Sequence, residues 1–215
     1  MHYGEFSGKN AGNILILGES HHISTTNETD MTAGVKASYS TEEVIYDYFK
    51  DRNNKDYFFF DKIVQSFGFL PEEREKFWNS VYFGNYVDVL CGVGDSFAKR
   101  VIKENREKYN NELFTFINEH NISTVFCFSV NVYSNGLPSL NKNSDEAEEK
   151  HIAGILNKKN VYVRHCFYRA GIEHGGADVI LRKDLEIYGI PHPSSKGGYS
   201  SELIGSVLVG KLPKE

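Results

Sequence analysis

Cysteines are scarce in this sequence, and their spacing excludes several kinds of site. Cys91, Cys127 and Cys166 are odd in number, widely separated and without a C-x-x-C pair. Three scattered thiols cannot supply the four ligands of an iron–sulfur cluster, and we expect no cofactor. Cys127 and Cys166 lie in apolar stretches, where a thiol usually packs as a small hydrophobe. This usage fits a reducing compartment, and we expect a cytoplasmic protein.

Long apolar runs and an excess of basic charge are also absent. No stretch approaches the roughly 18 uninterrupted apolar residues of a membrane-spanning helix, and no early run resembles a signal peptide. We therefore expect no membrane partner. The net charge of -5 and pI near 5.9 exclude a broad basic surface. Any contact with nucleic acid must then depend on a local patch of cations.

The chain has enough apolar material for one sizeable core. Its 215 residues are 40% hydrophobic and 13% aromatic, and two full domains would leave both cores thin. We expect one domain over residues 1–215, monomeric, with residues 1–12 as a loose lead-in.

Apolar runs alternate with amphipathic stretches along the chain. Ile14 to Leu17 form a continuous apolar run, which is typical of a strand covered on both faces. We predict a long loop over residues 24–40 and a solvated turn and helix start over residues 139–150. The other predicted helices are 41–50, 61–69, 71–80, one or two within 95–120, and 200–210; the other predicted strands are 81–90, 124–130, 160–167, 177–183 and 185–190.

This order predicts an α/β fold with a parallel or mostly parallel sheet and helices on both faces. The pieces between residues 161 and 184 are too close together for helical crossovers. We therefore expect one hairpin at the sheet edge.

The first polar cluster follows the first predicted strand directly. In "NILILGESHH", Gly18 permits a tight turn and a close backbone approach to a ligand. Glu19, Ser20 and the two histidines place proton-transfer and hydrogen-bonding groups at a strand end, where ligands of open α/β sheets bind. A polar surface turn is the alternative interpretation.

The second cluster is "IPHPSSKGG", residues 190–198. Prolines on each side stiffen the backbone around His192. Ser194, Ser195 and Lys196 precede two glycines, a set that suits a phosphate. The alternative is a loop that prolines and glycines merely punctuate.

The third stretch is "FWNSVYFGNYV", residues 77–87. Phe83 and Asn85 stand two apart and so face one side of a strand. An aromatic ring to stack on a base and an amide to read its edge suit a nucleobase pocket. An aromatic strand in the core is the alternative.

Taken together, "ILILGESHH", "VYFGNYV", "TVFCFSV" and "IYGIPHPSS" resemble the uracil-DNA glycosylase superfamily, and most closely a bacterial branch with a GESH-type first motif. The likeness covers residues 13 to about 207. It implies a three-layer αβα sandwich around a four-stranded, mostly parallel sheet, with a base pocket at the carboxyl ends of the strands. The implied partner is DNA, single- or double-stranded, or a free nucleobase or nucleotide.

The resemblance also implies residue roles. Phe83 would stack on a flipped base, Asn85 would read it, and His192 would hydrogen-bond the base oxygen that gains charge as the glycosidic bond breaks. Gly18 and Ser20 would border the base, while Ser194, Ser195 and Lys196 would lie at the DNA backbone.

The first motif departs from the family pattern. Members that activate water usually carry Asp or Asn where this chain has Ser20, and an unassisted serine hydroxyl is no base at neutral pH. We assign the positioning of water to Glu19, with His21 as the second candidate. If the reaction is largely dissociative, stabilising the departing base matters more than a strong nucleophile.

Three other interpretations stay open at this point. One keeps the fold and the pocket but only binds a base, nucleotide or modified DNA. Another pairs Ser20 with His21 or His22 in a hydrolase, although G-x-S-x-G is absent and neighbours on a strand point to opposite faces. The third is a two-histidine metal site, which adjacent histidines rarely form, so we expect no metal. His151, His165 and His174 are expected to have ordinary surface or core roles.

Overall fold

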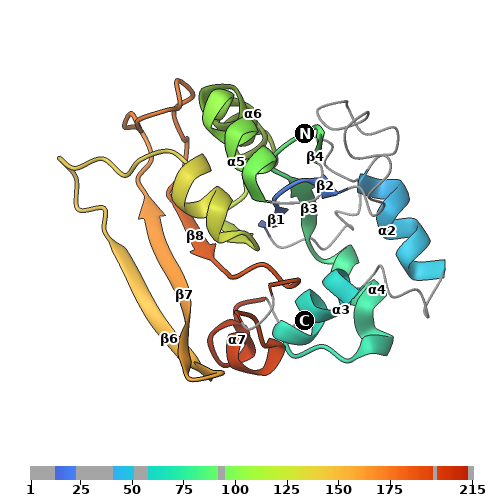
Figure 1. Ribbon diagram of the computed structural model, residues 1–215. Helices are drawn as coiled ribbons and strands as arrows, with labels where there is room; N and C mark the ends of the chain where they lie inside the picture. The colour runs from blue at the N-terminus through green and yellow to red at the C-terminus, as the bar shows by residue number, and fades with distance from the viewer. Residues whose placement is uncertain (1–12, 23–40, 51–57, 92–94, 196–197, 213–215) are drawn as a thin grey trace.

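The computed structural model describes residues 13–22, 41–50, 58–91, 95–195 and 198–212 (Figure 1). The predicted lead-in of residues 1–12, the whole predicted loop over residues 24–40, and Lys196 lie outside this part of the chain.

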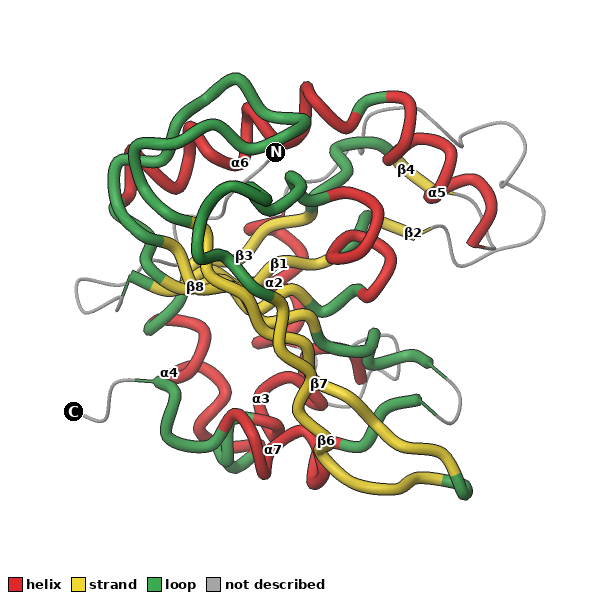
Figure 2. The backbone as a smooth tube through the Cα atoms, turned by 90° about the vertical axis from the view of Figure 1, so that its left-hand side faces the viewer, coloured by secondary structure: helices red, strands yellow, loops and turns green. Residues whose placement is uncertain are grey.

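A six-stranded sheet in the order β3-β1-β5-β8-β7-β6 forms the centre of the molecule (Figures 1 and 2). Neighbouring strands are parallel from β3 to β8, whereas β7 runs antiparallel to both β8 and β6. The prediction of an α/β fold with a mostly parallel sheet is confirmed. The strands are β1 (Ile14–Gly18), β3 (Tyr82–Asn85), β5 (Thr124–Cys127), β6 (Glu148–Leu156), β7 (Lys159–Tyr168) and β8 (Leu185–Gly189).

The expected number of four strands is wrong because a hairpin extends the sheet. Residues Glu148 to Lys150, predicted to begin a helix, instead begin β6, which pairs with β7. The strand predicted over residues 177–183 is also wrong. There the side chain of Asn111 accepts the amide of Asp178 at 2.7 Å and that of Asn118 accepts the amide of Arg182 at 2.9 Å. Side chains of α6 thus accept backbone amides that a neighbouring strand would accept if this segment belonged to the sheet.

The helices lie close to their predicted positions. The stretch 95–120 forms two helices, and the helix predicted from Asp61 begins earlier, at Phe58. No helix in the described ranges has the length and apolar character needed to cross a membrane. The helices are α2 (Thr41–Lys50), α3 (Phe58–Ser66), α4 (Arg74–Asn79), α5 (Asp95–Glu104), α6 (Arg106–His120) and α7 (Ser201–Leu208), with short turns η2 (Pro71–Glu73) and η3 (Val132–Gly136) and a small ladder of β2 (His21–His22) with β4 (Leu90–Cys91).

Helices cover both faces of the sheet, as predicted (Figure 2). Leu15 and Leu17 of β1 pack on one face with residues of α5 and α6. Ile14 and Ile16 pack on the other with residues of α2, α3, α4 and α7. Every residue of β1 is buried, which explains its uninterrupted apolar sequence.

The parallel strands β3, β1, β5 and β8 end at one common edge. Gly18 pairs with Asn85, and the ladder continues past the strand ends as Phe128 N–H donates to Leu17 at 2.8 Å and Ile190 N–H donates to Cys127 at 2.8 Å. The polar residues that follow these strands are therefore delivered to the same edge of the sheet.

Candidate functional site

Gly18 and Asn85 form the centre of this edge. They are register partners at the ends of β1 and β3, and a Cβ atom at position 18 would overlap Oδ1 of the Asn85 carboxamide. Only glycine leaves room for the amide in this position. The tight approach predicted for Gly18 therefore serves a neighbouring side chain in this structure.

Two polar side chains here lack the partners that burial normally demands. Asn85 and Ser20 are each only 9% exposed. Among the described residues, the Ser20 hydroxyl has no hydrogen-bond partner, and the Asn85 carboxamide forms no hydrogen bond there either. Buried polar groups are nearly always paired, so each such group calls for an explanation. A polar ligand at this edge would supply the missing partners.

The Glu19 carboxylate is held from the end of β5. The hydroxyl of Ser129 donates to one carboxylate oxygen of Glu19, and Nδ2 of Asn131 donates to the other at 3.3 Å. Ser129 in turn accepts the backbone N–H of Val132 at 3.1 Å. Two donors thus orient an ionisable group that projects from the β1 edge.

Ser129 and Asn131 are functional candidates that the sequence analysis missed. They follow a buried strand directly, which is the same signal that marked Glu19 and Ser20. The stretch "TVFCFSV" was interpreted as strand alone, so the polar residues at its end received no role.

Cys127 is not a candidate nucleophile. Its side chain is fully buried, and burial raises the pKa of the thiol to about 12, with a further increase from the nearby Glu19 carboxylate. The thiol is therefore protonated at neutral pH and unreactive.

The loop after β8 presents His192 with a defined tautomer. Nδ1 of His192 accepts the backbone N–H of Ser194 at 3.1 Å. In the neutral ring the proton then resides on Nε2, where the ring acts as a hydrogen-bond donor. The backbone carbonyl of His192 also accepts the N–H of Ser195, at 2.8 Å, which closes a tight turn.

Helix α3 braces this loop. Nζ of Lys62 donates to the carbonyl of Pro193 at 2.7 Å, and the hydroxyl of Tyr199 donates to the carbonyl of Lys62 at 3.0 Å. Tyr199 also pairs with the Ser66 hydroxyl at 2.5 Å. The position of His192 is thus set by contacts more than 100 residues away in sequence.

Phe83 lies within an aromatic cluster. Its ring makes edge-type contacts with Phe60 and Trp78, at centroid distances of 5.6 and 5.3 Å, and the residue is 4% exposed. Phe83 and Asn85 share a face of β3, but the phenyl ring offers little open surface in this structure.

Phe59 is the more accessible ring, and the sequence analysis did not single it out. It is partly exposed, and its centroid lies 5.1 Å from the His192 ring. Phe59 also contacts Phe60, which contacts Phe83. The first turn of α3 therefore connects the His192 loop to the β3 side of the edge.

The other predicted site residues are less informative. Ser194 and Ser195 are exposed, as a contact with a DNA backbone would need. The backbone of His21 pairs with Leu90, while its side chain and all of Lys196 lie outside the described part of the chain. Among described residues, the side chains that could together hold a metal ion lie on the β6–β7 hairpin.

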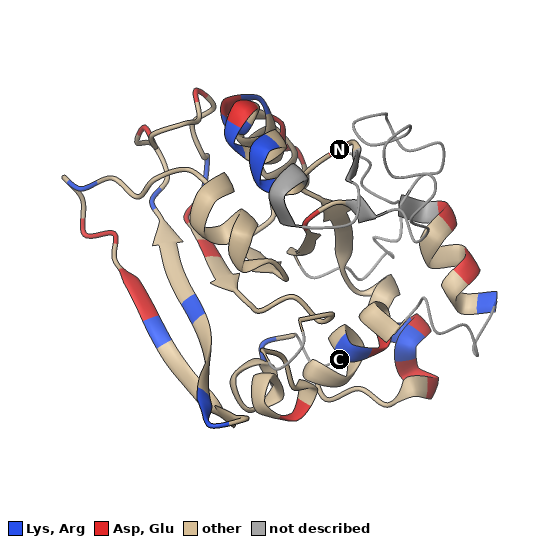
Figure 3. Cartoon of the chain, viewed as in Figure 1, with Lys and Arg blue, Asp and Glu red and all other residues tan. Residues whose placement is uncertain are grey.

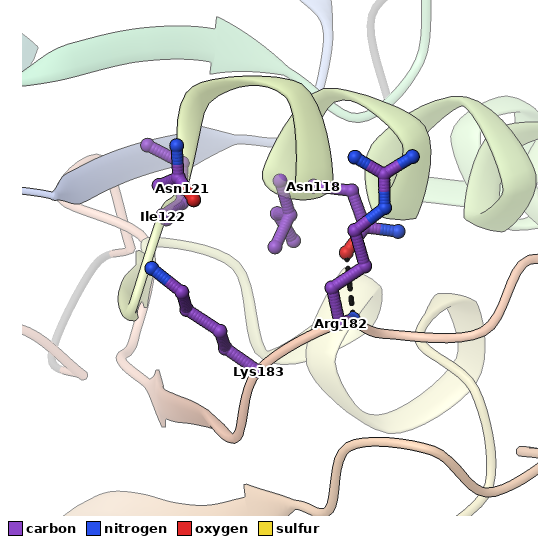
Figure 4. A pocket seen from close by; sticks show the side chains of 6 residues that line it. Asn118, Asn121, Ile122, Arg182 and Lys183 are labelled. Carbon is purple, nitrogen blue, oxygen red and sulfur yellow. Dashed lines mark hydrogen bonds between the residues drawn. The ribbon is translucent and has the colours of Figure 1, made fainter.

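Two surface hollows lie away from this edge. Figure 4 shows one between the end of α6 and the segment before β8, where Arg182 and Lys183 face Asn118 and Asn121. This hollow is at the amino ends of β5 and β8, opposite the Gly18 edge. The other, of about 700 Å³, lies beside His174 and residues 139–142.

The architecture and the site place the chain in a broad class, that of α/β proteins with a polar site at the carboxyl ends of parallel strands. A comparison with protein-family models finds no match, and a comparison with curated proteins finds none either.

Proposed function

We propose that this protein is a DNA base glycosylase of the uracil-DNA glycosylase type, which binds a flipped uracil-like or modified base and hydrolyses its N-glycosidic bond. The resemblance of four sequence motifs led to this hypothesis. The four adjacent parallel strands, with helices on both faces, agree with the three-layer sandwich that the resemblance implies.

The observation that carries the proposal is the carboxamide of the largely buried Asn85, which lies against Gly18 and forms no hydrogen bond with the described residues. An amide offers one acceptor and two donors, which complement the N–H and carbonyl groups on the edge of a uracil-like base. Because the glycine has no side chain, the amide lies directly against the end of β1. A bound base would supply hydrogen-bond partners that the described residues do not give this amide.

His192 is suited to stabilise the departing base. Its Nδ1 is occupied by the Ser194 amide, so Nε2 carries the proton that a base oxygen would accept as it gains negative charge. A preorganised donor of this kind contributes roughly 2.7–4 kcal/mol to transition-state stabilisation.

Glu19 is our candidate for positioning water, because Ser129 and Asn131 orient its carboxylate. The base would stack on Phe83 if the aromatic cluster opens, and Phe59 is a second ring of suitable position. In both arrangements the stacking surface comes from the side of the sheet that α3 covers.

Because the net charge is -5, we expect positive charge near this edge to be local, and one helix carries a small group of lysine and arginine side chains. Helix α5 packs against η3, which follows β5, and carries exposed Lys99, Arg100 and Lys103 (Figure 3). Together with Ser194 and Ser195, this helix is our candidate for contacts with the phosphate backbone.

The test is base release from oligonucleotides that contain uracil or one of a panel of modified bases. We expect release by the wild-type chain and a strong reduction in His192→Ala and Asn85→Ala. His120→Ala, which changes a histidine on α6 away from the site, is the matched control and should keep full activity. A chain that neither releases a base nor binds any of the oligonucleotides contradicts the proposal.

A second candidate function is recognition without hydrolysis. It is favoured by Ser20, which replaces the usual Asp or Asn and whose hydroxyl has no basic partner among the described residues. Saturable binding of a modified oligonucleotide that is weakened by Asn85→Ala, with no released base, would select this function.

A further inference from the structure

The β6–β7 hairpin brings together two histidines and a glutamate that are unremarkable in sequence. Glu149 and His151 are two residues apart on β6 and so lie on one face, and Glu149 is the register partner of His165 on β7. Figure 1 shows this hairpin as the outer edge of the sheet, beyond β8.

The three side chains converge on a small volume. Nε2 of His151 lies 3.5 Å from Oε2 of Glu149, and Nδ1 of His165 lies 3.8 Å from the same oxygen. All three potential ligand atoms lie within 4.8 Å of one another. Ligands about 2.0–2.1 Å from a tetrahedral zinc ion are separated from each other by roughly 3.3 Å. The two distances to the Glu149 oxygen are close to that value and long for direct hydrogen bonds.

A second carboxylate fixes the proton on His165. Nε2 of His165 pairs with Oε1 of Glu186 at 2.9 Å, and the same oxygen accepts the hydroxyl of Tyr188 at 2.6 Å. In the neutral ring this leaves a lone pair on Nδ1, directed at the Glu149 carboxylate. Such a carboxylate–histidine pair is the usual support of a metal-ligating histidine. The ring is also stacked on Tyr188, with centroids 4.5 Å apart.

We propose that Glu149, His151 and His165 bind a zinc ion, with Glu186 as the residue that orients His165. Two imidazoles and one carboxylate favour zinc over magnesium or calcium, which prefer all-oxygen sites. Three protein ligands leave the fourth position open to water or another ligand. The side chains of Glu149 and His151 are 66% and 44% exposed, so an ion reaches the site from solvent.

The charges around the cluster are mixed. Glu186 adds a negative charge beside His165. Lys211 adds a positive charge nearby, with its Nζ 5.2 Å from the centroid of the Tyr188 ring on which His165 stacks. Lys150 follows Glu149 on β6 and points to the opposite face of the strand. Bound zinc would join β6 to β7, which is hydrogen-bonded to β8, and so hold the outer hairpin to the sheet.

The experiment is calorimetric titration of the metal-free, full-length chain with zinc sulfate. We expect one ion per chain and a loss of affinity of at least about tenfold in His151→Ala and in Glu149→Gln. Glu186→Gln, which leaves all three ligands in place, should weaken binding by about 10–100-fold. Lys150→Ala on the same strand is the matched control and should bind as the wild type does.

Two further measurements keep the result interpretable. Cobalt(II) in the same protein should give the absorption of a tetrahedral nitrogen–oxygen site, and this signal should disappear in His151→Ala while the circular dichroism is unchanged. His21→Ala/His22→Ala should retain binding. Failure to bind zinc, equal affinity in His151→Ala, or loss of binding only in the His21/His22 variant overturns the proposal.

Discussion

Two buried polar regions of this molecule contrast sharply. At the end of β1 and β3, Asn85 and Ser20 are largely buried, and the Ser20 hydroxyl has no hydrogen-bond partner among the described residues. In the second region, the side chains of Glu146, just before β6, and of His174, in the segment after β7, are fully buried. The Glu146 carboxylate accepts three hydrogen bonds, from His174 and from the amides of Asn141 and Arg169, while Nδ1 of His174 has no hydrogen-bond partner among the described residues. The Glu146 carboxylate is fully paired within the protein, and such pairing stabilises a fold, whereas the Ser20 hydroxyl at the strand ends has no such partner and suggests a missing ligand.

The largest effect on stability should come from Glu146→Gln. Glutamine keeps one acceptor oxygen but turns an NH2 group toward the amide of Asn141, so a buried pair is broken. We expect a fall of about 3–5 kcal/mol in the free energy of unfolding, measured by urea denaturation. Glu173→Gln, an exposed glutamate nearby, should change it by less than about 0.5 kcal/mol. Equal loss of stability in the two variants would show that the Glu146 hydrogen bonds do not stabilise the fold more than an exposed glutamate does.

The same pair predicts an acid-side loss of stability. Burial tends to raise the pKa of Glu146, but hydrogen bonds from the amide of Arg169, the ring of His174 and the amide of Asn141 hold the pKa below its ordinary value of 4.5. The contribution of the carboxylate is therefore present above pH 4.5 and is lost as the pH falls through the lowered value. Urea denaturation between pH 6 and pH 3 should show this loss in the wild type and much less of it in Glu146→Gln.

His192→Ala should greatly reduce activity but leave stability nearly unchanged, the reverse of the effect of Glu146→Gln. If the proposed function is right, base release falls by about 100–1,000-fold because one preorganised donor is removed. The free energy of unfolding should change little, since the side chain is partly exposed. Single-turnover release, rather than substrate binding, is the decisive measurement. A variant that unfolds but retains its activity when folded would remove His192 from the mechanism.

Gly18→Ala tests the strand-end region by adding one methyl group without changing any charge or hydrogen-bonding group. The new Cβ would overlap Oδ1 of Asn85, so either the amide or β1 must shift. We expect a loss of about 1–3 kcal/mol in stability together with weaker binding of the base. Gly175→Ala is a suitable control, because there the added Cβ makes only an ordinary contact of 3.6 Å with Ser139.

Ser20→Ala should have the smallest effect on stability. Among the described residues the Ser20 hydroxyl forms no hydrogen bond, so its removal is expected to change stability by less than about 0.5 kcal/mol. A loss of base release or binding in this variant, at unchanged stability, would show that a ligand uses the hydroxyl. A clear destabilisation would mean that Ser20 has a structural partner.

Much of the parallel half of the fold could be predicted from local patterns. The apolar run at Ile14, the helix predicted over residues 41–50 and the amphipathic stretch after Asp95 all correspond to elements of the structure. The hairpin was harder, because β6 begins with exposed charged residues and lacks apolar alternation there. Its pairing with β7 depends on cross-strand register, which no short window of sequence reveals.

The candidate site divides in the same way. Gly18 and Glu19 were predicted because they follow an apolar strand directly, Asn85 because of its spacing from Phe83, and His192 because prolines flank it. Ser129, which orients Glu19, went unnoticed although it follows β5. Phe83 was expected to offer an open ring, but Phe60 and Trp78 pack against it. Neither neighbour's position can be deduced from the spacing within β3.

The amino-acid sequence alone determined which strands are buried on both faces and which polar residues stand at their ends, because burial and turn formation are local properties of the chain. Tertiary structure decided which of those residues meet. It placed the Asn85 amide over Gly18, two donors on Glu19 and the brace from Lys62 on the His192 loop, and it gathered Glu149, His151 and His165 across a hairpin. Such meetings depend on strand order and register, which are settled only when the whole sheet assembles.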